Sequence, residues 1–237
     1  DLDELNIVRA HKYPRATKFI DQIIEMIQIL EKKGYAYQTE DNSVFFRVSK
    51  FSDYGELANL NPNEMKIGDR VDNDEYEKEE IRDFALWKAY KDEDGEVFWD
   101  SPWGKGRPGW HIECSVMSTH YLGSSFDIHC GGVDNIFPHH ENEIAQSKCA
   151  LDDKFVNYWL HNEHLLVDNQ KMSKSLGNFY TIRDILDKGY KPEAIRYVLI
   201  SSHYRQKLNF TLSRLDDAQK AINRLRELVR RLKNVKD

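Results

Sequence analysis

A short apolar run that stops at two adjacent glycines limits the fold of this chain more than any other feature. The run at 126–132 (FDIHCGG) has the composition of a buried strand, and a helix is predicted over 139–149. A second run of strand composition follows at 155–160. Strand, helix and strand form the unit of a parallel sheet, in which ligands meet the carboxyl ends of the strands. The sequence therefore predicts an α/β fold with a binding site beside the glycines.

The predicted sheet is thin. Only two core strands are evident, whereas a doubly wound sheet has about five or six. Apolar residues recur at three- and four-residue spacing over 20–30, which predicts an amphipathic helix that Gly34 ends. Further predictions are a strand at 44–51, a polar solvated loop at 61–80, packed structure at 84–90, a rigid loop at 100–109, and helices at 110–121, from Pro192 onward and at 212–232.

Composition restricts the classes of protein that remain. A hydrophobic share of 40% in 237 residues is enough to build a core, and the net charge of −6 gives no general attraction to nucleic acid. No apolar run approaches the roughly 20 residues of a membrane span, and the opening DLDELNIVRA resembles no targeting peptide. Three cysteines indicate a reducing compartment, hence the cytoplasm. Two of them, Cys130 and Cys149, are predicted to be buried packing residues.

Two segments offer ligands for a metal ion. His139 and Glu143, in PHHENE, are four residues apart on a predicted helix and share a face, while His140 is expected to point elsewhere. Taken alone, such a pair is more often a surface salt link. Cys114, in GWHIECS, can be a buried apolar residue, but it can also add a soft ligand, and the three donors together suit Zn²⁺.

A polar loop is predicted at 171–178 (KMSKSLGN). It holds two lysines and two serines around one methionine, and Gly177 gives it flexibility. The simplest interpretation is a solvated surface loop. The remaining motifs of the chain suggest a more specific one.

Together these motifs resemble the class I cysteinyl-tRNA synthetases. The resemblance rests on GWHIECS, DIHCGGVD, FPHHENEIAQS and KMSKS, with YPRATKFI near the start and HYRQKLNF after the loop. KMSKS alone is typical of class I synthetases in general, whereas the combination is far more specific, and it covers nearly the whole chain. The resemblance implies a partial Rossmann-type catalytic domain with a connective insertion at 1–98, the second half of the Rossmann domain at 99–180, a stem-contact fold at 181–211, and the first helix of a tRNA-binding bundle at 212–237.

The resemblance also implies a reaction. The family activates cysteine with ATP and Mg²⁺ and transfers it from cysteinyl-adenylate to the 3′ end of tRNA(Cys). One zinc ion per chain, held by Cys114, His139 and Glu143, would bind the substrate thiol. Trp110 and His129 match residues of the cysteine pocket, although Trp110 can also be a core aromatic residue. We expect a monomer with tRNA, cysteine and ATP as partners and no contact with a membrane.

The polar loop has a role under this resemblance, because in the family it closes over ATP. Lys171 and Lys174 would stabilise the charge that grows as pyrophosphate leaves, and Lys174 is the first choice. The ATP-binding residues implied by the family are Gly131, Gly132, Asp134, Met172, Ser173 and Lys174.

The family pattern is incomplete in this sequence. No His-Ile-Gly-His motif occurs, and the family's remaining cysteine ligand to zinc has no counterpart. The sequence begins inside what resembles the connective insertion. We therefore expect an internal portion of a longer synthetase that is inactive alone.

Three other functions remain open. A cysteine ligase of the mycothiol pathway would also activate cysteine on zinc, but Glu143 as a ligand, HYRQKLNF and the basic final helix favour the tRNA enzyme. A non-catalytic RNA-binding paralogue would use the arginines of that helix, which can also form a solvated face. A zinc hydrolase with Glu141 as its base leaves the lysine loop unexplained.

Overall fold

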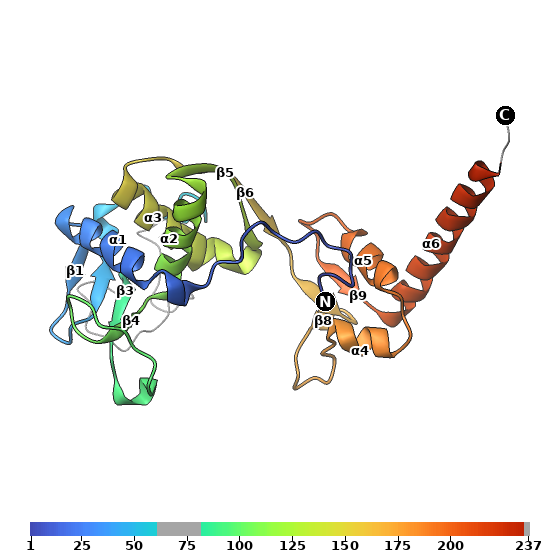
Figure 1. Cartoon of the computed structure of the whole chain (residues 1–237), viewed down its shortest axis with the longest axis horizontal. Helices are drawn as coiled ribbons and strands as arrows, with labels where there is room; N and C mark the ends of the chain where they lie inside the picture. The colour runs from blue at the N-terminus through green and yellow to red at the C-terminus, as the bar shows by residue number, and fades with distance from the viewer. Residues whose placement is uncertain (61–81, 235–237) are drawn as a thin grey trace. The chain divides into compact units, whose positions relative to one another are not determined.

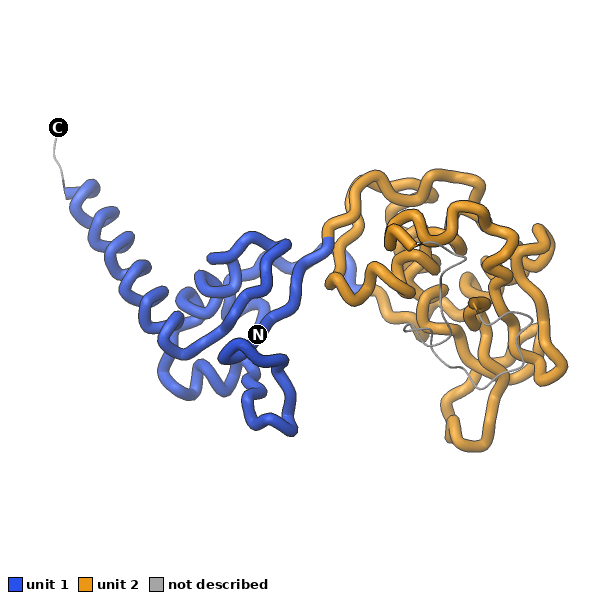
Figure 2. Tube along the Cα trace, turned by 180° about the vertical axis from the view of Figure 1, so that it is seen from behind, with its two compact units in different colours: residues 1–13, 161–237 blue, residues 14–160 orange. Residues whose placement is uncertain are grey.

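The structure is a computed structural model that describes residues 1–60 and 82–234 (Figure 1). The loop predicted at 61–80 lies outside these ranges. The chain divides into two compact units (Figure 2). Residues 14–160 form the larger unit, and residues 1–13 with 161–237 form the smaller unit. The domain boundaries expected at 98, 180 and 211 stay predictions.

The larger unit is built on a four-stranded antiparallel sheet in the order β1-β2-β3-β4. In its middle, Phe46 lies opposite Ala36 on one side and Phe84 on the other. The rings of Phe46 and Phe84 stack with centroids 4.9 Å apart, so the sheet supplies aromatic core. The strands are β1 (Ala36–Gln38), β2 (Val44–Phe46), β3 (Phe84–Ala89) and β4 (Gly106–Pro108).

Two predictions for this sheet need correction. The strand predicted at 44–51 ends at Phe46, because buried Asp83 accepts the backbone N–H of Val48 at 2.9 Å and draws the chain out of the ladder into a short 3₁₀ turn. The loop predicted at 100–109 contains a strand, β4, which pairs with β3. The packed segment at 84–90 is confirmed as β3.

Three helices pack together beside this sheet (Figure 1). Helix α1 buries the predicted stripe completely at Ile23, Ile27 and Leu30. Helices α2 and α3 contact each other, and Ser115 Oγ donates to Gln146 Oε1 at 2.6 Å between them. The predicted helices are therefore confirmed, as α1 (Ile20–Lys32), α2 (Trp110–Leu122) and α3 (Glu141–Leu151).

Helix α3 begins two residues later than predicted. The preceding segment Ile136–His140 is an irregular turn of π type, in which Phe137 has extended backbone angles (φ −133°, ψ 133°). The turn follows β5 (Ser125–Gly132), which pairs with β6 (Phe155–Asn162) in a sheet of two strands. The two predicted strands and their thin sheet are thereby confirmed within the described ranges. The expectation that 126–132 is a buried strand is wrong, because no residue of β5 is buried, while β6 buries only Phe155 and Val156.

Lys33 fastens α1 to the end of α3. Its Nζ donates to the carbonyls of Cys149 at 3.0 Å and Ala150 at 2.9 Å, and pairs with Asp152 at 2.6 Å. The last carbonyls of a helix have no partners inside the helix, so this cation caps them. The contact holds the helix that follows the π-type turn.

We expect Lys33→Met to lower the free energy of unfolding of the larger unit by about 1–2 kcal/mol, because the carbonyls of Cys149 and Ala150 lose a charged donor. Urea unfolding followed by tryptophan fluorescence measures it, since all five tryptophans lie in 14–160. Lys32→Met, at the exposed neighbouring position, is the control. Equal stabilities of the two variants would contradict the capping role.

The smaller unit has its own core. Strand β7 pairs antiparallel with β8 and parallel with β9, and buried Val167 and Leu215 lie in one cluster with Leu5 from the start of the chain. Arg196 Nη1 donates to the carbonyl of Leu5 at 2.9 Å, which holds that segment in place. The elements are β7 (Leu165–Val167), β8 (Gln170–Lys171), α4 (Ile182–Asp187), α5 (Pro192–Ile200), β9 (Leu208–Phe210) and α6 (Leu212–Lys233).

The helices predicted from Pro192 onward and at 212–232 are confirmed as α5 and α6. Across the described ranges, none of the helices has the length and apolar character needed to cross a bilayer.

Candidate functional site

Three predicted ligands meet in the larger unit. Cys114 comes from α2, His139 from the π-type turn and Glu143 from the first turn of α3. One ligand atom from each lies within 4.8 Å of the other two. His139 is 5% exposed and Glu143 is 0% exposed. The packing of α2 against α3 therefore shields these two side chains from solvent.

The two carboxylate oxygens of Glu143 have different surroundings. His129 Nε2 donates to Oε2 at 3.0 Å. Oε1 lies 3.0 Å from His139 Nε2, yet it accepts no well-formed hydrogen bond from any described residue. Burial alone would raise the pKa of Glu143, but the neighbouring His129 and His139 outweigh it and lower the pKa, so the carboxylate is ionised. A buried anionic oxygen without a donor is costly unless a cation meets it.

Cys114 supplies the third donor. Burial, reinforced by the carboxylates of Glu143 and Glu113, raises the pKa of its thiol to about 12. The thiol is therefore protonated at neutral pH in the absence of a cation. A sulfur, an imidazole nitrogen and an unpaired carboxylate oxygen form a donor set that fits Zn²⁺ or Co²⁺.

A histidine that the sequence analysis missed touches this cluster. His111 is 6% exposed, and its Nδ1 lies 2.8 Å from Nδ1 of His139. Burial, with His139 nearby, lowers the pKa of His111 to about 3, so its ring is neutral. The signal was present in the sequence, because His111 precedes Cys114 by three residues and so lies on the same face of α2.

His140 faces the site, contrary to the expectation that it points elsewhere. Its ring is 2% exposed and lies 4.8 Å from the rings of His129 and Trp159. With His129 and Glu143 it forms a second group whose ligand atoms all lie within 4.8 Å. The helical rotation of 100° per residue fails here because residues 136–140 are not a regular helix. Glu143 thus belongs to two groups of candidate ligands, one with Cys114 and His139 and one with His129 and His140.

The residues matched to the substrate pocket lie beside the cluster. Trp110 begins α2, is 52% exposed, and stacks on the His139 ring with centroids 4.4 Å apart. His129, in β5, contacts Glu143 as described. Trp110 therefore presents an open aromatic face at the mouth of the cluster rather than filling the core.

The double glycine permits close approach of the backbone. A Cβ on Gly131 would lie 2.6 Å from Cε1 of His140, and one on Gly132 would lie 2.4 Å from Oδ1 of Asp134. Asp134 itself is exposed at the end of β5. The strand ends at Gly132, as predicted, and neither glycine leaves room for a Cβ.

The other two cysteines differ from each other. Cys149 is buried in the core, as predicted, and burial raises the pKa of its thiol to about 12. Cys130 is exposed, which corrects the expectation that it is buried. The side chains of β5 alternate, so the strand that turns His129 toward Glu143 turns Cys130 outward.

The lysine loop belongs to the smaller unit. Lys171 and Lys174 are exposed, and Gly177 has a positive φ of 67°. Met172 packs against the core of the unit. Ser173 donates its backbone N–H to Asn178 Oδ1 at 2.9 Å. The loop is therefore braced by its own side chains while its ammonium groups remain open to solvent.

We expect Asn178→Ala to make trypsin cleave after Lys171 and Lys174 about fivefold faster, because Asn178 also donates to the carbonyl of Lys171 at 3.2 Å and each such bond contributes about 1 kcal/mol. Limited proteolysis with mass spectrometry gives the rates. Asn209→Ala, which removes an acceptor from the neighbouring turn at Asn169, is the control. Unchanged cleavage at the lysines would contradict the bracing role.

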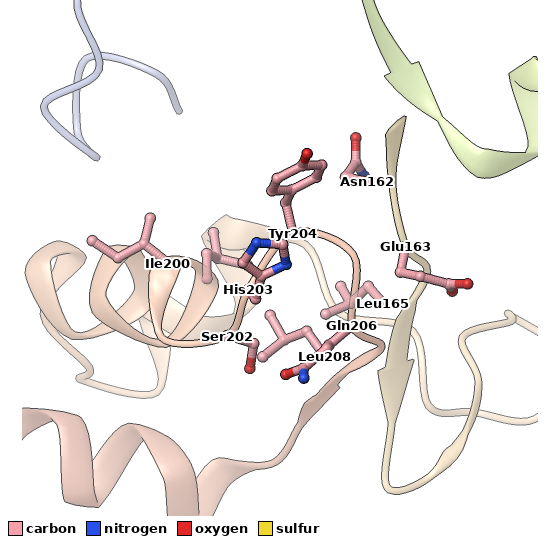
Figure 3. Close-up of a pocket in the computed structure, with 10 residues that line it drawn as sticks. Asn162, Glu163, Leu165, Ile200, Ser202, His203, Tyr204, Gln206 and Leu208 are labelled. Atoms are coloured by element: carbon pink, nitrogen blue, oxygen red, sulfur yellow. The ribbon is translucent and has the colours of Figure 1, made fainter. Parts of the chain in front are cut away.

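A cavity of about 460 Å³ lies elsewhere in the smaller unit (Figure 3). Leu165 and Leu208 line it together with the stacked rings of His203 and Tyr204, whose centroids are 4.7 Å apart. None of the residues predicted for the site lines this cavity.

Two alternative functions lose support from side-chain contacts. The Glu141 carboxylate accepts the backbone N–H groups of Gly55 at 2.7 Å and Ala58 at 3.0 Å, so it braces a loop instead of serving as a base. On α6, most arginines suggested for RNA have carboxylate or carbonyl partners within the unit: Arg214 with the Asn209 carbonyl, Arg226 with Glu193, and Arg230 and Arg231 with Glu227.

Solved structures identify the class of fold. The chain is similar to methionyl-tRNA synthetase from Mycobacterium tuberculosis in complex with methionyl-adenylate (TM-score 0.63, 16% identity, 91% of this chain and 52% of that one). It is also similar to a putative arginyl-tRNA synthetase from Campylobacter jejuni (TM-score 0.55, 16% identity, 90% and 38%). The fold is that of a class I synthetase catalytic domain, mixed α/β and partial, as expected.

The family follows from the sequence. Residues 1–220 match the model of the tRNA synthetases class I (C) catalytic domain, and the chain belongs to that family. It is 60% identical over 237 residues to a cysteine–tRNA ligase of Brachyspira hyodysenteriae, covering 99% of this chain and 50% of the relative. It is 56% identical over 235 residues to that of Chlamydia trachomatis serovar D, covering 99% and 49%. The chain spans about half the length of the curated relatives it matches.

Proposed function

We propose that this chain carries the cysteine-selecting part of an ATP-dependent cysteine–tRNA ligase, in which Cys114, His139 and Glu143 hold a zinc ion. The observation that carries the proposal is the convergence of a thiol, an imidazole and a buried carboxylate, whose ligand atoms lie within 4.8 Å of one another. The names of the relatives supply the reaction. A metal-free pocket rejects an isosteric substrate only about 100-fold, whereas a thiol and a hydroxyl differ far more as zinc ligands.

Each residue of the larger unit has a distinct task in this proposal. Bound zinc would supply a Lewis acid that takes the substrate thiol. His129 orients Glu143 by donating to Oε2, which leaves Oε1 for the cation. Trp110 presents the aromatic wall along which a small side chain can lie. Gly131 and Gly132 keep the strand end clear of Cβ atoms, so that the backbone can approach an adenylate.

The lysine loop would act on ATP, which is bound as its Mg²⁺ complex. Lys171 and Lys174 are solvent-exposed and can meet the phosphates, and they would stabilise the charge that develops as pyrophosphate leaves. Ser173 and Met172 hold the loop on its unit. The product, cysteinyl-adenylate, would pass its cysteinyl group to tRNA(Cys). We propose a cytoplasmic, monomeric enzyme; a reducing compartment would keep its three cysteines free.

Cobalt spectroscopy tests the metal and the substrate together. We expect Co²⁺ added to the chain to give a thiolate-to-cobalt charge-transfer band, which grows further when cysteine is added and stays unchanged when serine is added. Equal responses to cysteine and serine would overturn thiol selection, and no band at any Co²⁺ concentration would overturn the metal centre. Aminoacylation of a tRNA(Cys) transcript by a protein of the relatives' full length distinguishes the tRNA enzyme from a mycothiol-pathway ligase.

A further inference from the structure

The contact between His111 and His139 joins two nitrogen atoms of the same kind. The two Nδ1 atoms are 2.8 Å apart in a buried site, so one must carry a proton and donate it while the other accepts. Only two arrangements of neutral rings are possible. Either His139 donates from Nδ1 and keeps Nε2 bare, or His111 donates and His139 carries its proton on Nε2.

The two arrangements differ at the metal site. His139 Nε2 is the nitrogen that faces Glu143 Oε1, at 3.0 Å. With a proton on Nε2, His139 could not bind a metal ion through that atom. With Nε2 bare, its lone pair can bind the same cation as Oε1, which lies 3.0 Å away. A metal ion bound by both atoms therefore requires donation by His139.

The ring of His111 is well placed to enforce this choice. It lies in the first turn of α2, one turn before Cys114. The ring of Phe84, from β3, meets it edge-on with centroids 5.9 Å apart, and the ring of Trp110 lies 5.0 Å away. The His111 ring is also 6% exposed, so its packing restricts movement away from His139.

We propose that His111 is a positioning residue: by accepting a hydrogen bond from Nδ1 of His139, it holds the tautomer whose Nε2 is bare toward the metal ion. The inference rests on the proposed metal centre and adds a residue to it. Metal-binding histidines usually donate their second N–H to a neighbour, and loss of that neighbour weakens metal binding about 10- to 100-fold. Here the neighbour is another imidazole, supplied by the helix that also supplies the cysteine.

Three variants of the chain test the role, with Co²⁺ as the probe. His111→Leu removes the acceptor. His111→Asn keeps an acceptor, its side-chain oxygen, close to the position of Nδ1. His120→Asn changes an exposed histidine of the same helix and is the matched control. The dissociation constant for Co²⁺ is taken from the charge-transfer band, and the melting temperature of each metal-free variant is measured by tryptophan fluorescence.

We expect His111→Leu to bind Co²⁺ about 10- to 100-fold more weakly, and His111→Asn to stay within about threefold of the original chain. Equal Co²⁺ binding by His111→Leu and the original chain would overturn the inference, and so would an Asn variant as weak as the Leu variant. If His111→Leu does not fold, His111→Gln replaces it, because glutamine places its amide near Nε2 instead. Equal binding by the Gln and Asn variants would then refute the role.

The outcome separates this inference from the proposed function. If the original chain gives the cobalt band and its cysteine response while His111→Leu does so equally well, only the role of His111 fails. If the original chain gives no band, the metal centre fails and the role of His111 fails with it.

Discussion

Cys114→Ser is expected to remove the thiolate-to-cobalt charge-transfer band completely and to weaken Co²⁺ binding by more than about 100-fold. Serine keeps the size of the side chain but loses the sulfur, and its hydroxyl gives up its proton far less readily than a thiol. The two remaining donors, His139 and Glu143, form only half of a tetrahedral site. Absorption titration with Co²⁺ in the near ultraviolet and visible ranges measures both effects.

Cys130→Ser is the matched control, because Cys130 is exposed on β5 and offers no atom to the cluster. It should leave the band and the affinity unchanged. A band that survives in Cys114→Ser and disappears in Cys130→Ser would mean that Cys130 binds the metal. That outcome would contradict the proposed centre.

Gly109→Ala is expected to lower the free energy of unfolding of the larger unit by about 3 kcal/mol or more. Gly109 caps the start of α2 with φ −65° and ψ 157°, angles that any residue adopts, so backbone strain contributes nothing. A Cβ there would lie 2.0 Å from the carbonyl oxygen of Ala85 on β3. Because backbone cannot yield as a side chain does, α2 must move away from the sheet and take Trp110 and Cys114 with it.

Denaturant unfolding followed by tryptophan fluorescence gives the stability, and Co²⁺ titration should show weakened binding by the same variant. Gly95→Ala is the contrasting control, since Gly95 has φ 69° and open space around it. With φ 69° and ψ −137°, its backbone lies in a region that favours glycine, so the variant carries strain of about 1–3 kcal/mol and no clash. A Gly109→Ala variant no less stable than Gly95→Ala would mean that α2 and β3 are not packed as described.

The sequence predicted the pairing of His139 with Glu143 because its geometry is local. His139 and Glu143 are separated by four residues, and that spacing survives even though the turn before α3 is irregular. Cys114 was added to this pair because its sulfur is a soft donor. Its position depends on the packing of α2 against α3. That packing could not be predicted from the sequence, because neither helix has a clear amphipathic pattern.

The orientations of His111 and His140 could not be predicted in this way. The position of His140 beside Glu143 depends on the extended backbone angles at Phe137, and no periodicity in the sequence reveals these angles. His111 has a ligand neighbour only because His139 arrives from a distant segment. The strands β1 and β4 were missed for a related reason: each has three residues, too few for a pattern, and is fixed by pairing with partners remote in the chain.

The two units have separate hydrophobic clusters, and the proposed ligands all come from one of them. An ion held by α2 and α3 ties together elements of the larger unit alone. At a free concentration 1,000 times its dissociation constant, such an ion adds about 4 kcal/mol to the stability of whatever it binds. In a calorimetric scan, the melting temperature of residues 14–160 should therefore rise with Zn²⁺. The melting temperature of the smaller unit, which carries the lysine loop, should not change. A rise in the melting temperature of one unit alone would thus show which unit binds the ion, and this measurement needs no chromophore.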